Sequence, residues 1–140
     1  MTANPEEVMR LKIILPTRVL LEREVVKVRA ESRGGAYTLL PRHADCLTDL
    51  VAGMFSYVDA TGREEYAGVD EGTLEKHGRE IRMAVRHAWL GGTDPSGFRH
   101  RLARALDEEE QRRRRAVGAQ ARLEADLIRH LLSTRGSQAP

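Results

Sequence analysis

The sequence predicts a mainly β N-terminal sandwich or barrel with a C-terminal α-helical appendage. Between residues 9 and 85, short runs with alternating apolar and polar residues are separated by turn signals, which is typical of packed antiparallel sheets. After Gly91-Gly92 the apolar spacing changes to that of a helix. We therefore expect an antiparallel β-sandwich domain in residues 1–90 and a helical region in residues 91–140.

Each predicted strand is a short run in which every second residue is apolar. Residues 9–15 show this pattern most clearly, because Arg10 and Lys12 alternate with apolar neighbours. In the run 24–31 we expect Val26, Val28 and Ala30 to face the core. The other expected strand segments are residues 19–21, 37–40, 53–59 and 66–69, and the two arms of a hairpin that turns at His77-Gly78. Asp59-Ala60-Thr61-Gly62 and Asp70-Glu71-Gly72 are expected turns.

The helical region has a clear start signal. Asp94 can cap a helix whose first residue is Pro95, because proline needs no hydrogen-bond acceptor at that position. A first apolar stripe follows at helical spacing, at Phe98, Leu102, Ala105 and Leu106. A second stripe follows further on, at Leu123, Leu127, Ile128, Leu131 and Leu132.

A charged run separates the two stripes. Residues 107–115 contain no apolar side chain, and three glutamates (Glu108, Glu109 and Glu110) each precede an arginine by four positions, the favoured order for helical ion pairs. Gly118 is the expected break between two helices of a hairpin. One unbroken long helix also fits the pattern.

Composition excludes several classes of protein. The single cysteine, Cys46, excludes an intrachain disulfide, and no apolar run approaches the roughly 20 residues of a membrane span. Residues 1–7 lack the pattern of a secretory signal, so we expect a cytoplasmic protein. Residues 1–90 carry 13 basic and 14 acidic side chains, whereas residues 91–140 carry 10 and 7. The basic excess therefore lies in the helical region.

One short run, residues 34–48, organises the chain. Gly34 and Gly35 permit a sharp turn, and the next residues favour a strand. Pro41 should end that strand because it lacks a backbone N–H group. Two polar residues, Arg42 and His43, then follow a rigid corner where they can reach a partner. We expect Leu47 to return the chain to the core.

This run resembles the G-x-x-G-I-L-P-x-H-A-P-L-L-T segment of the epsilon subunit of F-type rotary ATP synthases. Leu39-Leu40-Pro41 matches the apolar pair and the proline, His43-Ala44 matches the His-Ala pair, and Leu47-Thr48 closes the motif. The resemblance covers residues 9–90 well and the rest in outline.

The departures from the motif are Thr38 for glycine, Asp45 for proline and Cys46 for an apolar residue. The form Leu-Pro-Arg-His-x-Asp, with Val69-Asp70-Glu71-Gly72 downstream, is more similar to the alternate, N-type branch of the family. An acidic residue by which family members contact the membrane ring is replaced here by Ala36, so that contact is not carried over.

The resemblance implies a non-catalytic rotor subunit of a proton- or sodium-translocating ATP synthase or ATPase. Its partners would be the gamma subunit and the c-ring, which would hold it at the inner face of the bacterial membrane. The partner-binding residues that the resemblance and the corner together suggest are Tyr37, Thr38, Pro41, Arg42, His43 and Asp45.

The resemblance also implies a regulatory role for the helical region, which in this family can reach an acidic loop of the beta subunit. The candidate residues are Arg112, Arg113, Arg114 and Arg115. A solvated helix face is an equally simple interpretation of these arginines. Some bacterial members bind ATP through an Asp-x-x-Arg-Ala motif, but with Asp94 in register the arginine position is Gly97. We therefore expect no bound nucleotide or other cofactor.

The remaining motifs do not support chemistry. Catalysis by a pair of Cys46 and His43 would need an orienting group and an oxyanion site, and none is recognisable. The five histidines show no convincing metal-ligand spacing, so no metal is expected. Acidic neighbours nearly cancel the arginine run and no aromatic residue is near, which disfavours nucleic acid. The alternative function is a free-standing β-domain binding module with a basic helical arm that docks acidic protein or nucleic acid.

Overall fold

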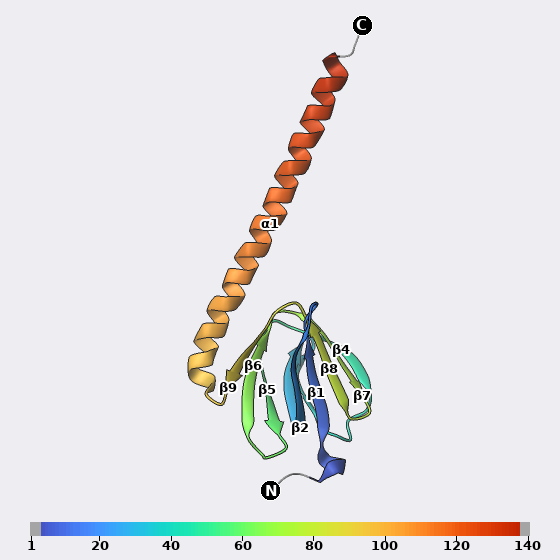
Figure 1. Ribbon diagram of the computed structural model, residues 1–140, viewed down its shortest axis with the longest axis vertical. Coiled ribbons are helices and arrows are strands. Elements are labelled where there is room, and N and C mark those ends of the chain that lie inside the picture. Colours follow the sequence, from blue (N-terminus) through green and yellow to red (C-terminus); the bar gives the residue numbers. More distant parts are fainter. Residues whose placement is uncertain (1–3, 138–140) are drawn as a thin grey trace. The chain divides into compact units, whose positions relative to one another are not determined.

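The computed structural model describes residues 4–137, and within them it shows a nine-stranded β-sandwich and one long C-terminal helix (Figure 1). The predicted fold class is confirmed. The chain divides into two compact units, Met1–Leu106 and Asp107–Pro140, which are described separately below.

The predicted strands are present in the expected order, together with elements that the sequence did not predict. A short 3-10 helix, η1 (Pro5–Glu7), precedes the sheet. The strands are β1 (Met9–Ile14), β2 (Val19–Ser32), β3 (Gly35–Leu39), β4 (Cys46–Leu50), β5 (Gly53–Asp59), β6 (Glu64–Val69), β7 (Gly72–His77), β8 (Glu80–Val85) and β9 (Ala88–Gly92). The helix α1 covers Pro95–Ser137.

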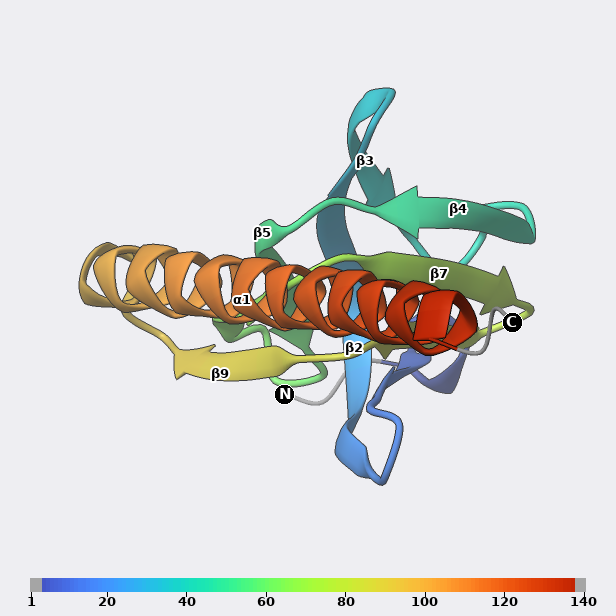
Figure 2. The ribbon, with the colours of Figure 1, turned by 90° about the horizontal axis from the view of Figure 1, so that it is seen from above.

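The strands are hydrogen-bonded in the order β4-β7-β8-β1-β2-β5-β6-β9, with β3 also paired to β2. The first half of β2 pairs with β1, and its second half pairs with β5 and β3, so this strand belongs to both layers of the sandwich. In Figure 2, β2 runs crosswise to β4, β7 and β9. The predicted antiparallel pairing holds for every pair of neighbouring strands except β1 and β8, which pair in parallel.

The core lies between the layers and is filled by alternate side chains of the strands. The side chains with no exposed surface are those of Met9, Leu11, Ile13, Val25, Val28, Leu39, Ala67, Leu74, Ile81 and Met83. The prediction that Val26 faces the core was wrong. A β-bulge between Val25 and Lys27 shifts the alternation by one residue, so Val25 is buried and Val26 is partly exposed.

The expected turn at residues 59–62 is confirmed and closes the β5–β6 hairpin. One oxygen of the Asp59 carboxylate accepts hydrogen bonds from the backbone N–H groups of Thr61 (2.9 Å) and Arg63 (3.0 Å) and from the Thr61 hydroxyl (2.6 Å). The hydroxyl bond is the main cause of a lowered pKa of Asp59. Gly62 takes the positive φ of 89° that the turn requires.

The sequence did not predict two of the strands, β4 and β9. The position of Leu47 on β4 also differs from the prediction. β4 and β9 are the end strands of the hydrogen-bonded order. The prediction that Leu47 returns the chain to the core was wrong, because Leu47 is 75% exposed. Its neighbours Cys46 and Thr48 are partly buried instead. Pairing with β7 fixes this facing, because Leu47 lies opposite the exposed Glu75.

The helix starts as predicted. The Asp94 carboxylate accepts a hydrogen bond from the Ser96 backbone N–H (3.2 Å), and Pro95 is the first helical residue. Phe98 and Leu102 are 3% and 4% exposed and pack against Gly91 of β9 and Gly68 of β6. The first turns of α1 therefore belong to the same unit as the sandwich.

From residue 107 onward, no side chain up to residue 134 is buried. The preferred break at Gly118 was wrong, because α1 passes through this residue without interruption and the alternative of one long helix is the observed one. Of the expected four-residue ion pairs, Glu110 with Arg114 is confirmed at 3.2 Å. Arg112 pairs with Glu109, three positions away, rather than with Glu108. Among the described residues, no helix is both long and apolar enough to span a membrane.

Candidate functional site

The candidate site is the connection between β3 and β4, residues 40–45, which we call the corner. The corner closes on itself through a hydrogen bond from the His43 backbone N–H to the Leu40 carbonyl (2.9 Å). The side chains of Arg42 and His43 are exposed, while Pro41 is partly buried. The corner therefore presents two polar side chains from a turned backbone.

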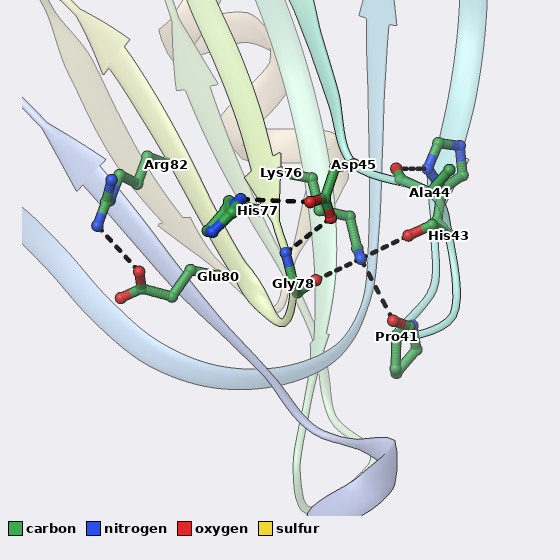
Figure 3. A network of polar contacts seen from close by, with 9 residues as sticks. All are labelled: Pro41, His43, Ala44, Asp45, Lys76, His77, Gly78, Glu80 and Arg82. Carbon is green, nitrogen blue, oxygen red and sulfur yellow. Dashed lines mark hydrogen bonds and ion pairs between the residues drawn. The ribbon is translucent and has the colours of Figure 1, made fainter.

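Asp45 ties the corner to the β7–β8 turn (Figure 3). Its carboxylate accepts a hydrogen bond from the Gly78 backbone N–H (2.7 Å) and lies 3.2 Å from Nδ1 of His77. Gly78 has a φ of 59°, so it supplies the left-handed conformation of the turn, as predicted for His77-Gly78. The aspartate that replaces the family's proline thus makes specific contacts with the neighbouring hairpin.

Lys76, which belongs to none of the sequence motifs, lies on β7 beside the corner and is only 2% exposed. Its Nζ donates hydrogen bonds to the backbone carbonyls of Pro41 (3.3 Å), His43 (2.7 Å) and Gly78 (2.5 Å). A signal for this burial was present, because Lys76 is two residues after the buried Leu74 and so shares its face of the strand.

The other two candidate residues lie on β3. Thr38 is exposed, but Tyr37 is partly buried and packs against the core. The Tyr37 hydroxyl is buried without a hydrogen-bond partner among residues 4–137. Burial raises the pKa of Tyr37 to about 12, with smaller contributions from Cys46 and Asp49. Tyr37 therefore packs against the core, whereas Thr38, Arg42, His43 and Asp45 have exposed surface.

A surface hollow of about 530 Å³ adjoins the corner. Its lining combines apolar side chains, among them the exposed Leu40, with charged ones. Its lining residues are Asn4, Glu6, Glu7, Val26, Leu40, Pro41, Arg42 and Arg79. The mixture of exposed apolar surface and charge suits contact with another protein.

His43 and Cys46, which were considered as a catalytic pair, each have other neighbours. His43 Nδ1 lies 2.8 Å from the Ala44 carbonyl oxygen, and Cys46 is partly buried against the core. Within residues 4–137, no three His, Cys, Asp or Glu side chains gather in a way that could hold a metal ion.

The arginine run lies on α1 as predicted, with all four side chains exposed. Glutamates of the same helix contact three of them: Arg112 pairs with Glu109, and both Arg113 and Arg114 pair with Glu110 at 3.7 Å and 3.2 Å. Arg115 makes no ion pair with any residue that the structure describes. Exposed pairs of this kind contribute about 0–1 kcal/mol each, so the arginines can exchange these partners for others at little cost.

Comparison with known proteins identifies the class to which this sandwich and corner belong. Residues 8–91 match the family model described as "ATP synthase, Delta/Epsilon chain, beta-sandwich domain". The chain belongs to this family, and its members of the epsilon type are non-catalytic subunits of ATP synthase.

Individual relatives agree with this assignment. The chain is 34% identical to "ATP synthase epsilon chain 2" of Cereibacter sphaeroides over 87% of its own length and 84% of that protein. It is 29% identical to "ATP synthase epsilon chain 2" of Paraburkholderia xenovorans, over 91% of this chain and 96% of that protein. A chain in the cryo-EM structure of Euglena gracilis mitochondrial ATP synthase, OSCP/F1/c-ring, shares the fold with a TM-score of 0.58 and 13% identity. That match covers 63% of this chain and 56% of the other.

Proposed function

We propose that this chain is the epsilon subunit of the central stalk of an F-type ATP synthase or ATPase, where it joins gamma to the c-ring. The complex would translocate protons or sodium ions and would hold the chain at the inner face of the bacterial membrane. Structural neighbours occur in assemblies named for F1 with the c-ring and for the central stalk with the c-ring. Family membership favours this function over that of a free-standing binding module.

One observation carries the proposal: the corner presents Arg42 and His43 from a backbone that is fixed at several points. Lys76 and Asp45 fasten the corner to the β7–β8 hairpin, and the hollow beside it offers apolar surface. A rotor subunit transmits torque through rigid contacts and performs no bond chemistry. A fixed corner with exposed side chains meets that requirement, whereas a mobile loop would not.

The proposal is tested by the double variant Arg42→Glu, His43→Glu. Both side chains are exposed, so the variant should fold with nearly unchanged stability. It should assemble less well with purified gamma and c-ring, as measured by co-purification. The matched control is Thr17→Glu, Arg18→Glu, which makes the same change of net charge at two exposed residues between β1 and β2. Equal assembly of the two double variants would refute the role of the corner.

We further propose that the region 91–140 regulates ATP hydrolysis through Arg112, Arg113, Arg114 and Arg115. Their exposure supports this role, because four cations on one helix attract a carboxylate-rich loop over about 8–10 Å. The loop of the beta subunit that the family resemblance suggests is such a partner. Glu109 and Glu110 compete for the same arginines, so the attraction should be modest and sensitive to salt.

We assign the chain to the alternate, N-type branch of the family. Two observations support this assignment. Both relatives described above are named as a second epsilon chain. In addition, Asp45, which replaces the proline of the common motif, accepts a hydrogen bond from the backbone N–H of Gly78 in the β7–β8 turn. Of the three departures from the common motif, Asp45 is therefore the one that joins the corner to the neighbouring hairpin.

A further inference from the structure

Lys76 is the most unusual side chain of the sandwich, because it is a buried lysine. The chain has only three lysines, and Lys12 and Lys27 both retain exposed surface. Burial of an ammonium group is costly unless it is hydrogen-bonded. Among the described residues, no carboxylate forms an ion pair with Lys76. The side chain must therefore be stabilised in another way.

That stabilisation comes from three backbone carbonyls. An ammonium group has three donors, and all three are used: two reach the corner at Pro41 and His43, and the third reaches Gly78 in the β7–β8 turn (Figure 3). Because the acceptors belong to two separate loops, a single side chain links them. A core-filling role alone would not require this arrangement of acceptors.

Both backbone polar groups of Gly78 take part in this connection. The carbonyl of Gly78 accepts from Lys76, while its N–H donates to Asp45 of the corner. The corner is thus bonded to the hairpin through its carbonyls, through Asp45 and through the shared turn residue. Loss of Lys76 would leave the Pro41 and His43 carbonyls without these donors, whereas the Asp45 contacts would remain.

We propose that Lys76 is the positioning residue of the corner: it holds the backbone of residues 41–43 in the conformation that presents Arg42 and His43. Lys76 does not itself reach a partner, because it is buried. The inference about the backbone is independent of what the corner binds. Only its consequence for assembly depends on the proposed function.

The test is the variant Lys76→Met in the full chain, with Lys27→Met as the matched control. Methionine keeps much of the apolar volume and removes the charge and all three hydrogen-bond donors, and urea unfolding measures the global stability of each variant. The reporter is hydrogen exchange of the His43 amide, which is bonded to the Leu40 carbonyl within the corner. At equal global stability, exchange at His43 should be at least tenfold faster in Lys76→Met and unchanged in Lys27→Met. Unchanged exchange at His43 in Lys76→Met overturns the proposal.

A second measurement uses the wild-type chain and does not depend on the folding of a variant. Reductive methylation modifies accessible lysine amines, so Lys12 and Lys27 should react at least tenfold faster than Lys76 in the native protein. Equal rates at the three lysines would overturn the proposal, because the three hydrogen bonds of Lys76 require a buried amine.

Assembly with gamma and the c-ring separates this inference from the proposed function. Faster exchange at His43 together with weaker assembly supports both. Faster exchange with normal assembly supports the role of Lys76 and contradicts the corner as the interface. Normal exchange at His43 contradicts the role of Lys76 whatever the assembly result.

Discussion

The ring of Phe98 packs directly on the backbone of Gly91: a Cβ atom at Gly91 would lie only 2.3 Å from Cδ2 of the ring. Leu102, one turn further along α1, contacts Gly68 in the same way, with a corresponding distance of 2.2 Å to Cδ1. Two glycines on adjacent strands, β6 and β9, therefore form the surface on which the helix begins. Neither position leaves space for a side chain while the helix remains in place.

The first prediction follows from this contact. Gly91→Ala should lower the free energy of unfolding by about 1–3 kcal/mol, the usual cost of overpacking, because the rigid ring of Phe98 cannot yield as the tip of a flexible chain can. Urea unfolding can be followed by the fluorescence of Trp89, the only tryptophan, which lies on β9. Gly34→Ala is the control, since its Cβ would meet only the Ser32 hydroxyl at 3.6 Å. Equal midpoints for the two variants would contradict the packing argument.

The second prediction concerns truncation of the helical region. A chain that ends at Leu106 should remain folded, whereas one that ends at Thr93 should be destabilised by several kcal/mol. The reason is that Phe98 and Leu102 are buried against the sheet, and full burial of such side chains contributes about 1.5–3 kcal/mol each. Thermal unfolding of the two truncated chains measures this difference. Equal stability would show that these contacts contribute nothing.

The shorter deletion also tests regulation without harming the sandwich. If the arginines inhibit, a complex with the chain ending at Leu106 should hydrolyse ATP faster than the intact complex at low salt. The difference should diminish as salt is added, because exposed charges are screened. Identical rates at low salt would reduce Arg112, Arg113, Arg114 and Arg115 to a solvated helix face.

The third prediction concerns alkaline pH. The folded chain holds the pKa of Tyr37 at about 12 because its hydroxyl is buried, whereas a tyrosine of the unfolded chain ionises near pH ~10. This raised pKa contributes stability that is complete below pH ~10. It is lost as the pH rises from ~10 to about 12, where the unfolded chain binds fewer protons than the folded one. Urea midpoints measured across this range should fall less steeply for Tyr37→Phe than for the wild type.

Tyr57 provides the contrasting variant. Burial and a hydrogen bond to Glu65 (2.7 Å) raise its pKa as well. At neutral pH, Tyr37→Phe should change stability little, because the Tyr37 hydroxyl has no partner among residues 4–137. Tyr57→Phe should cost about 1 kcal/mol, because it removes a hydrogen bond from a partly buried carboxylate.

Parallel pH profiles of the urea midpoint for Tyr37→Phe and the wild type would contradict the raised pKa of Tyr37.

The strands that the sequence predicted well are those whose alternation reflects burial of one face. Met9, Leu11 and Ile13 are buried and alternate with Arg10 and Lys12, as the pattern requires. β4 was missed because its apolar Leu47 faces outward. Its facing is set by pairing with β7, and no local pattern encodes that pairing. β9 was missed because it is short and ends in two glycines that contact the helix or turn the chain.

The candidate site was also predicted only in part, because some of its features are local in sequence and others depend on strand pairing. Pro41, Arg42 and His43 could be placed at a corner because proline ends a strand by its own covalent structure. Lys76 could not be assigned to the corner, because its three acceptors become neighbours only when β4 pairs with β7. Gly118 misled the prediction, since a glycine within a helix costs about 1 kcal/mol relative to alanine but does not by itself break the helix.

The shared strand β2 has a mechanical consequence. Its 14 residues are bonded to β1 over one half and to β5 and β3 over the other, so the two layers have one common strand. A force that slides one layer along the other must shear the hydrogen bonds of β2 with several neighbours at once, rather than open them one after another. The sandwich should therefore be stiff under a sideways load applied at the corner and yield as a single unit.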